Sequence, residues 1–408
     1  MKKTTMQKYA RLIARKGINV QKNQEVIVNA SLDQPEFVKM VVEECYRAGA
    51  KKVTVEWSYQ PLTKLNYRYR SMKTLSTIEK WEEEKLAHRC DVLPAMIYID
   101  SDDPDGLKGI DQNKVSKASQ ARYPILKPYI DKMENKYQWC IAAVPGEAWA
   151  KKVFPGERVG KAVEKLWDAI LYTSRADGED PVQAWEDHNA DLKARYDYLN
   201  SLGIESLHYT ASNGTNFTVG LISDGLFLGG SEDTLGGVEF NPNIPSEEVF
   251  TSPMKGKADG IVYATRPLSY RGEIIDNFSV RFENGKAVEV HAEKGEELLK
   301  QMISMDENAA YLGECALVPY DSPIRNSEIT FFNTLFDENA CCHLALGRGF
   351  ENCLKDYDKY THEECRQKGI NDSIIHVDFM IGSQDLDIDA HTADGRDVAI
   401  FRNGNWAF

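Results

Sequence analysis

The sequence predicts two domains of different class: an α/β domain over residues 1–190 and an α+β, largely antiparallel domain over residues 191–408. The length of 408 residues exceeds one ordinary hydrophobic core and suits two. The first half alternates strand-like apolar runs with helical patterns, which is typical of a parallel sheet covered by helices. The second half has short alternating runs separated by turn residues, which is typical of antiparallel strands.

The first half begins with a β-α-β pattern. Apolar, β-branched runs predict strands at 25–29 and 52–57, and the helical pattern between them, at 34–48, ends at Gly49. Strands joined by such a crossover helix run parallel in one sheet. A further buried strand is predicted at 139–144, so we expect a parallel sheet in this half.

The change of pattern follows two amphipathic helices, predicted at 157–173 and 181–202, and it places the domain boundary near residue 190. Beyond it, Asn-Gly pairs mark hairpin turns, because both residues tolerate the positive φ angles of a type I′ turn. These pairs are at 213–214, 284–285 and 403–404, and short helices are predicted at 295–305, 339–346 and 361–368.

The composition excludes several classes of function. Hydrophobic residues make up 42% of the chain, but no run approaches the roughly 20 apolar residues of a membrane-spanning helix, so we expect no membrane partner. A formal net charge of -14 repels phosphate backbones, so nucleic acid is not expected as a partner either. No G-x-G-x-x-G or P-loop motif follows the first strand, and we expect no nucleotide cofactor.

The expected location is cytoplasmic. Residues 1–17 have the pattern of a folded amphipathic helix rather than of an export signal, which would need an apolar run and a cleavage site. The eight cysteines form no C-x-x-C pair, so a structural zinc site made of cysteines is not indicated. Reduced, buried thiols are the simplest interpretation.

The most informative segment is the apolar strand predicted at 374–381, which contains one histidine and one acid. His376 and Asp378 are two residues apart, so in a strand both side chains lie on the same face. Burying an imidazole and a carboxylate together is costly unless they pair with each other or bind a cation. A hydrogen-bonded His-Asp pair is the plain alternative, and further ligands are needed to decide between the two.

Upstream segments supply further candidates. Glu314 lies in an apolar, strand-like run, where a lone carboxylate is rarely buried without a partner. Glu247 and Glu248 are adjacent in a similar run, so strand alternation lets only one of them face a given site. His343 lies in the short helix predicted at 339–346, which would end at a glycine.

This set of residue types points to a centre of divalent metal ions. Two histidines with several carboxylates suit zinc, cobalt or manganese, and the surplus of carboxylates favours two ions. Paired ions roughly 3.5 to 4 Å apart share ligands, lower the pKa of a bound water and polarise a carbonyl oxygen. Hydrolysis is therefore the expected class of reaction.

Four segments carry a resemblance to a known family: NPNIPSEEVFTSP at 241–253, LGECALV at 312–318, FDENACCHLALG at 336–347 and NDSIIHVDFMIG at 371–382. In order and spacing they resemble the thermophilic-type metallo-aminopeptidases, the M29 family of aminopeptidases S, T and II. The resemblance implies peptide substrates, two divalent ions and a homodimer. It also implies an α/β first domain that is a scaffold and partly encloses the substrate, and a catalytic, metal-binding second domain.

Transferred residue by residue, the resemblance implies five metal ligands, with Glu314 as the bridge: Glu248, Glu314, His343, His376 and Asp378. It implies that Glu247 or Glu338 supports the ligands or acts as the general base. One departure concerns Phe350, which stands where the family usually has a tyrosine. The missing hydroxyl donor corresponds to about 100- to 1,000-fold in turnover.

Two other functions remain open from the sequence. A mononuclear non-haem Fe(II) oxygenase needs only the 2-His-1-carboxylate set formed by His343, His376 and Asp378. A metal-retaining relative with weak catalysis would follow from Phe350. Metal stoichiometry separates the first alternative from the dinuclear hydrolase, and the turnover of the wild type tests the second.

Overall fold

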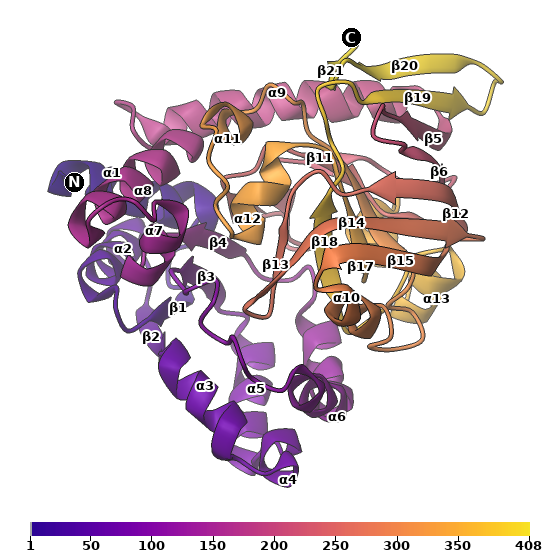
Figure 1. Cartoon of the computed structure of the whole chain (residues 1–408). Coiled ribbons are helices and arrows are strands. Elements are labelled where there is room, and N and C mark those ends of the chain that lie inside the picture. Colours follow the sequence, from indigo (N-terminus) through magenta and orange to yellow (C-terminus); the bar gives the residue numbers. More distant parts are fainter. Residues whose placement is uncertain (1) are drawn as a thin grey trace. The chain divides into compact units, whose positions relative to one another are not determined.

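The computed structural model describes residues 2–408, and the chain divides into two compact units (Figure 1). The first unit comprises the residues up to Asn189 together with Gly230–Ser246. The second comprises Ala190–Gly229 and Glu247–Phe408. The segment 230–246 thus lies with the first unit, although it follows residue 190, and the predicted boundary between two domains stays a prediction.

The first unit is built on a five-stranded sheet in which every neighbouring pair is parallel. Its order is β10 (Asn243–Ile244), β4 (Trp139–Ala143), β3 (Ala95–Asp100), β1 (Glu25–Ser31) and β2 (Lys52–Ser58). The predicted β-α-β pattern and the parallel sheet are confirmed. Between β1 and β2, α2 (Pro35–Ala48) begins with a proline in its first turn and ends at Gly49, whose φ of 112° suits glycine.

Helices make up most of the rest of the first unit. They are α1 (Lys3–Leu12), which continues as a π-helical turn over Ile13–Gly17, α3 (Gln60–Tyr69), α4 (Met72–Ser76), α5 (Lys80–Val92), α6 (Gln112–Met133), α7 (Glu147–Val153) and α8 (Val159–Thr173). A small ladder joins β8 (Glu232–Asp233) to β9 (Glu239–Phe240). Both long helices predicted before the boundary are confirmed, as α8 and as α9 (Pro181–Ser201).

The second unit contains two antiparallel sheets. The five-stranded sheet has the order β18 (His376–Met380), β17 (His343–Gly347), β16 (Leu312–Leu317), β11 (Val249–Thr251) and β7 (Leu228–Gly229). The nine-stranded sheet has the order β13 (Leu268–Tyr270), β14 (Glu273–Glu283), β12 (Pro253–Tyr263), β6 (Asn216–Leu221), β5 (Ile204–Thr210), β19 (Asp387–Thr392), β20 (Asp397–Arg402) and β21 (Asn405–Trp406), with β15 (Lys286–Lys294) paired to β14. The predicted antiparallel class of this half is confirmed.

The three Asn-Gly pairs lie in hairpin turns, as predicted. They join β5 to β6, β14 to β15 and β20 to β21. At the second of these turns both central residues have positive φ, 50° at Asn284 and 81° at Gly285. The short helices of this unit are α10 (Glu296–Met302), α11 (Pro323–Asn326), α12 (Thr334–Asp337) and α13 (His362–Gln367).

The helix predicted at 339–346 is wrong, because the chain forms β17 there. A 3-10 turn over Glu338–Ala340 ends the helical segment, and Cys341 is extended at φ -171°. The strand from His343 to Gly347 then pairs with β16 on one side and β18 on the other, and all five of its residues are buried. Pairing on both sides outweighs local helical preference, because a buried backbone needs all its hydrogen bonds.

The five-stranded sheet has two unlike faces. One face packs into a hydrophobic core that also contains residues of the nine-stranded sheet: Cys315, Leu317, Leu344, Leu346, Val377 and Phe379 from the first, and Tyr209, Phe217, Val280 and Ile388 from the second. Because side chains alternate along a strand, the residues between these core positions lie on the other face. That face contains Glu314, His343 and Asp378, all buried.

No helix among residues 2–408 combines the length and the hydropathy that a bilayer crossing requires.

Candidate metal centre

Three neighbouring strands bring the candidate ligands together. Pairing places Ala345 of β17 opposite Glu314 of β16 on one side and opposite Asp378 of β18 on the other. Alanine has only a methyl group, so it leaves space above the sheet in which the two carboxylates can approach each other. The predicted alternation on β18 is confirmed, since Nε2 of His376 lies 3.3 Å from Oδ1 of Asp378.

The five predicted ligands form two groups, each able to surround one ion. Glu248, Glu314 and His343 offer ligand atoms within 4.8 Å of one another. Glu314 also belongs to the second group, with His376 and Asp378. Nε2 of His343 is 3.0 Å from Oε2 of Glu248, and Nε2 of His376 is 3.1 Å from Oε2 of Glu314. The structure thus places Glu314 in both groups, the position that a bridging carboxylate needs.

Backbone carbonyls fix the orientation of both imidazoles. Nδ1 of His376 is 2.7 Å from the carbonyl oxygen of Arg348, and Nδ1 of His343 is 3.3 Å from that of Cys341. A carbonyl can only accept a hydrogen bond, so each Nδ1 is the protonated nitrogen. Each Nε2 then faces the carboxylates, and the lone pair that it has once deprotonated is directed at the same side, which is the arrangement that metal-binding histidines use.

Burial and mutual repulsion control the protonation of the carboxylates. Burial raises the pKa of Glu314 to about 7, and the charges of Glu248 and Asp378 add to that rise, although His376 opposes it. Burial also raises the pKa of Glu338 well above its ordinary value, with Asp378 and Glu248 as further causes. Without a cation, these acids therefore share negative charge that is costly to bury.

The pKa values of the two histidines are raised as well, but by the neighbouring carboxylates and not by burial. Burial by itself lowers the pKa of His343, but Glu248 and Asp378 outweigh it and raise that pKa well above its ordinary value. For His376, the carboxylates of Asp378 and Glu314 likewise outweigh burial and raise the pKa. Protons thus balance part of the negative charge, and a divalent cation can replace them, so metal binding at this site should release protons.

The donor set fits divalent metal ions. Oδ1 of Asp378 is buried, and no hydrogen bond of good geometry satisfies it among the residues that the structure describes, although Nε2 of His376 lies 3.3 Å away; this suits an atom directed at a cation. Imidazole nitrogens with carboxylate oxygens are the ligands that zinc, cobalt and manganese accept, whereas calcium and magnesium prefer oxygen alone. The structure therefore supports a metal centre made by these five residues, although their assignment as ligands stays a prediction.

The two predicted acid-base candidates differ in their surroundings. Glu338 lies in the 3-10 turn after α12 and is buried. Burial and the charges of Asp378, Glu248 and Glu314 raise its pKa. Glu247 is also buried, and its backbone N–H donates to Oδ1 of Asn339 at 2.6 Å. The electrostatic coupling to the ligands favours Glu338 as the group that carries a proton.

A buried ion pair supports the segment that contains Glu338. Asp337 accepts hydrogen bonds from the backbone N–H groups of Phe331, at 2.9 Å, and Asn333, at 3.1 Å. Its Oδ1 also lies 3.3 Å from Nη1 of Arg266. The carboxylate of Asp337 thereby fixes the loop that precedes α12. The sequence did not predict this ion pair, because Arg266 and Asp337 are far apart in the chain and no local pattern links them.

Asp337 predicts a pH dependence of stability. Burial raises its pKa from 3.8 to about 6, although Arg266 and backbone N–H groups oppose the rise. The folded state binds the proton of Asp337 more tightly than the unfolded state does, and this tighter binding stabilises the fold. The stabilisation is complete below pH 3.8 and is lost as the pH rises through 6. The free energy of unfolding of the wild type minus that of Asp337→Asn should therefore fall by about 2 kcal/mol between pH 4 and pH 7. Urea unfolding of both proteins with a chelator present measures this difference in free energy of unfolding. A difference that stays constant between pH 4 and pH 7 contradicts the prediction.

Phe350 lies beside His376, one of the predicted ligands. Its ring centroid is 4.9 Å from that of His376 and 5.4 Å from that of Phe250. Its backbone N–H donates to Oγ of Ser252 at 2.8 Å, which fixes the chain where it leaves β17. With Phe250, Ala316 and Cys353 it forms an apolar wall beside the more exposed of the two histidines.

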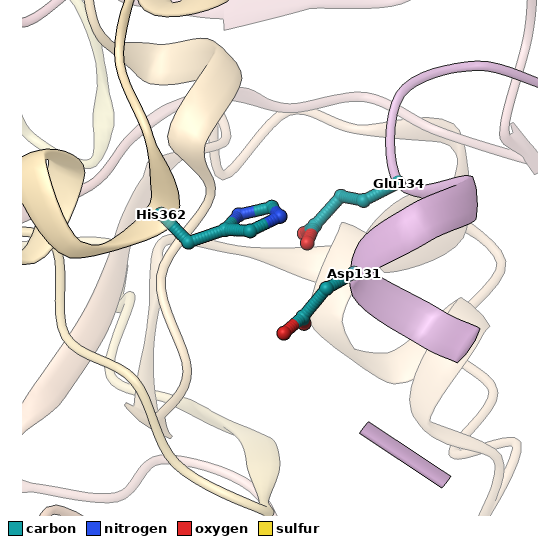
Figure 2. A group of neighbouring side chains, drawn as sticks. All are labelled: Asp131, Glu134 and His362. Atoms are coloured by element: carbon teal, nitrogen blue, oxygen red, sulfur yellow. The ribbon is translucent and has the colours of Figure 1, made fainter. Parts of the chain in front are cut away.

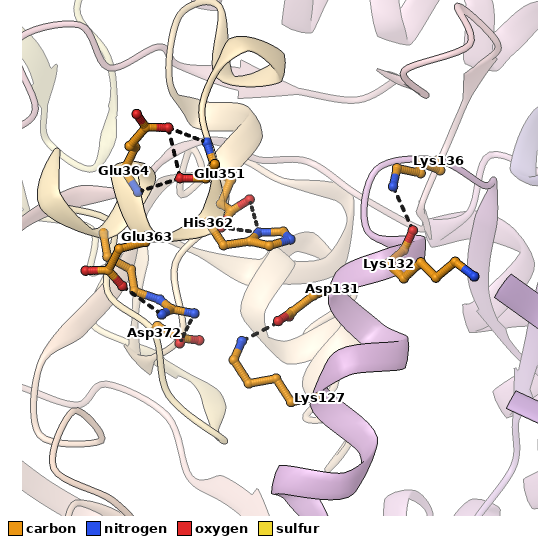
Figure 3. Close-up of polar contacts among 11 residues, drawn as sticks. Lys127, Asp131, Lys132, Lys136, Glu351, His362, Glu363, Glu364 and Asp372 are labelled. Carbon is orange, nitrogen blue, oxygen red and sulfur yellow. Dashed lines mark hydrogen bonds and ion pairs between the residues drawn. The ribbon is translucent and has the colours of Figure 1, made fainter. Parts of the chain in front are cut away.

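Further titratable side chains, in each of the two units, have structural partners. Figure 2 shows Asp131 and Glu134 at the C-terminal end of α6, and His362 at the start of α13. Figure 3 shows the ion pair of Asp131 with Lys127, 2.9 Å long, and the contact of His362 with the carboxylate of Glu351, 2.8 Å long. Asp131 and Glu134 belong to the first unit and His362 to the second. The Asp131–Lys127 pair therefore lies within the first unit and the His362–Glu351 pair within the second.

Comparisons with known proteins identify the family of the chain. The sequence model of the thermophilic metalloprotease (M29) family matches residues 2–406. The aminopeptidase AmpS of Bacillus subtilis (strain 168) is 43% identical over 401 residues, which are 98% of this chain and 98% of that protein. Among solved structures, wild-type AmpT from Thermus thermophilus is 38% identical, with a TM-score of 0.89 and complete coverage of both chains.

A more distant structure shares only the fold. The 2,5-dihydroxypyridine dioxygenase from Pseudomonas putida KT2440 is 14% identical, with a TM-score of 0.52 over 99% of this chain and 96% of that one. Such low identity says nothing about activity, so it does not favour the oxygenase alternative. The similarity to AmpT also supports the mixed α/β content predicted from the sequence.

Proposed function

The chain belongs to the thermophilic metalloprotease (M29) family and is a metal-dependent aminopeptidase that acts on peptides, and from that premise we propose a dinuclear centre with Glu314 as its bridge. The observation that carries the proposal is the membership of Glu314 in both ligand groups. Glu248 and His343 complete one ion site, and His376 and Asp378 complete the other. Zinc, cobalt or manganese suits these donors.

The proposed centre assigns a separate role in hydrolysis to each group. When bound, paired divalent ions lower the pKa of a water and polarise the carbonyl of the scissile peptide bond. Glu338 takes up a proton at its carboxylate and returns it to the leaving amine, a role that fits its burial near Glu248 and Asp378. The carbonyl oxygens of Arg348 and Cys341 keep both imidazoles in one tautomer throughout.

The wider organisation is also part of the proposal. The α/β domain at 1–190 serves as a scaffold that partly encloses the substrate, and the domain at 191–408 is catalytic. Two copies of the chain assemble as a homodimer in the cytoplasm. Light scattering coupled to size-exclusion chromatography gives the mass in solution, where one chain is 46.1 kDa. A species of one chain mass at assay concentration would contradict the dimer.

The test of the proposed function is cleavage of aminoacyl-arylamides and short peptides after addition of cobalt, zinc or manganese to the metal-free protein. We expect release of the N-terminal residue, loss of activity with a chelator, and two ions per active chain. An N-acetylated copy of the same peptide is the matched control and should stay intact. Cleavage of the acetylated peptide, or full activity with one ion per chain, would contradict the proposal.

Phe350 gives a prediction about turnover. Phe350→Tyr adds a hydroxyl donor to a ring that already lies against His376, so kcat should rise about 100- to 1,000-fold with the metal content unchanged. Steady-state kinetics with metal analysis measures this. Phe154→Tyr, which makes the same chemical change in the first unit, should leave kcat unchanged. A Phe350→Tyr variant with wild-type kcat would show that the hydroxyl has no role here.

A further inference from the structure

One buried amide joins the segments that contain Glu248 and Glu338. Asn339 has 0% of its surface exposed and lies in the 3-10 turn that leads into β17. Its Oδ1 accepts a hydrogen bond of 2.6 Å from the backbone N–H of Glu247, which is 92 residues away in the chain. Its Nδ2 donates to the carbonyl oxygen of Leu335 at 2.9 Å and lies 3.4 Å from Oε1 of Glu338.

The two ends of this amide act on different parts of the centre. The acceptor end holds the backbone at Glu247, and the next residue is Glu248, whose carboxylate lies 3.0 Å from Nε2 of His343. The donor end contacts Glu338, whose carboxylate lies near the negative charges of other acids and near the positive charge of His343. A neutral donor beside a buried carboxylate fixes its position without adding charge.

The amide of Asn339 does more than fill space in the core. A hydroxyl or carboxylate side chain could satisfy one of its two partners, but the amide satisfies both at once. A backbone N–H such as that of Glu247 needs only an acceptor, and a carboxylate such as that of Glu338 needs only a donor. The amide supplies both from one rigid plane, so the position of Glu338 is coupled to that of Glu248. Groups that orient metal ligands commonly change metal affinity or activity about 10- to 100-fold when they are replaced.

We propose that Asn339 is a positioning residue that holds Glu338 and the Glu247–Glu248 segment in one arrangement, and so sets both the affinity of the Glu248–His343 ion site and the rate of proton transfer by Glu338. The proposal rests on the proposed function, because it takes the roles of Glu248 and Glu338 from it. It concerns a residue that binds neither the substrate nor an ion.

Asn339→Asp separates the two ends of the amide. The aspartate keeps an acceptor for the N–H of Glu247, but it replaces the donor beside Glu338 with a second acceptor that carries a charge. Asn339→Ser is the neutral companion variant, and it serves if the aspartate variant does not fold. The matched control is Asn241→Asp, because Asn241 is also 0% exposed and its amide pairs with Asn189 in the first unit.

The experiment titrates each metal-free protein with Mn²⁺ by calorimetry and measures kcat and KM on an aminoacyl-arylamide, with thermal unfolding as the check of folding. For Asn339→Asp we expect kcat to fall about 10- to 100-fold, one of the two Mn²⁺ sites to lose affinity by a similar factor, and KM to change less than about threefold. Asn339→Ser should change in the same direction by less. Asn241→Asp should lower the melting temperature and leave kcat, KM and Mn²⁺ affinity unchanged.

Wild-type Mn²⁺ affinity and kcat in a folded Asn339 variant, or changes no larger than those of Asn241→Asp, would overturn the positioning role. A wild type that binds two Mn²⁺ ions without cleaving peptides would overturn the peptidase mechanism alone. The calorimetric comparison of Asn339→Asp with Asn241→Asp would still decide the role of Asn339 in that case.

Discussion

Glu314→Gln is expected to abolish peptidase activity while the protein stays folded. Glutamine keeps the shape of the side chain but is a poor ligand for two ions, so both sites that share Glu314 should lose affinity together. Without the stabilisation that two ions give to the transition state, worth several kcal/mol, kcat/KM should fall at least about 1,000-fold. Metal analysis should show fewer than one ion per chain in place of two.

The stability of the same variant should change in the opposite direction. Glu314 is 4% exposed and lies near the carboxylates of Glu248 and Asp378, so in metal-free protein its charge is costly to bury. The melting temperature of Glu314→Gln in a chelator should therefore equal or exceed that of the wild type. Glu289→Gln, the same change on an exposed part of β15, should alter neither activity nor metal content. A Glu314→Gln protein with two ions and wild-type turnover would contradict the bridging role.

The second large effect distinguishes the two ion sites. His343→Ala removes one ligand of the group with Glu248, and His376→Ala removes one ligand of the group with Asp378. Because the groups share only Glu314, each variant should keep one ion and lose the other. Activity should fall about 1,000-fold in both, since the chemistry needs both ions.

Metal analysis after dialysis, together with calorimetric titration, measures the loss in each histidine variant. His291→Ala is the matched control, because His291 is 68% exposed and lies on β15. Loss of both ions in each single variant would show that the sites are not separable. Retention of both ions with full activity in either variant would remove that histidine from the set of ligands.

The sequence predicted the parts of the centre that follow from strand periodicity. His376 and Asp378 are two residues apart, and this spacing alone places them on one face of β18. Glu314 could be identified because a carboxylate in an apolar run must have a partner. The hairpins also followed from local chemistry, since Asn-Gly suits positive φ wherever it occurs.

Other parts depend on contacts between distant segments, which no local pattern shows. The strand that contains His343 has a sequence compatible with a helix, and only its pairing with β16 and β18 decides its structure. The role of Ala345 in leaving space between two carboxylates can be recognised only when Glu314 and Asp378 are known to lie on either side of it. Asn339 adjoins Glu338 in the sequence, but its second partner, Glu247, is 92 residues away.

The most direct test of the central claim is anomalous scattering from crystals grown with zinc, measured on both sides of the zinc absorption edge. We expect two peaks per chain roughly 3.5 to 4 Å apart, with the carboxylate of Glu314 between them. His343 and Glu248 should contact one peak, and His376 and Asp378 the other. A single peak held by His343, His376 and Asp378, or a pair of peaks that Glu314 does not bridge, would contradict the dinuclear centre proposed for this chain.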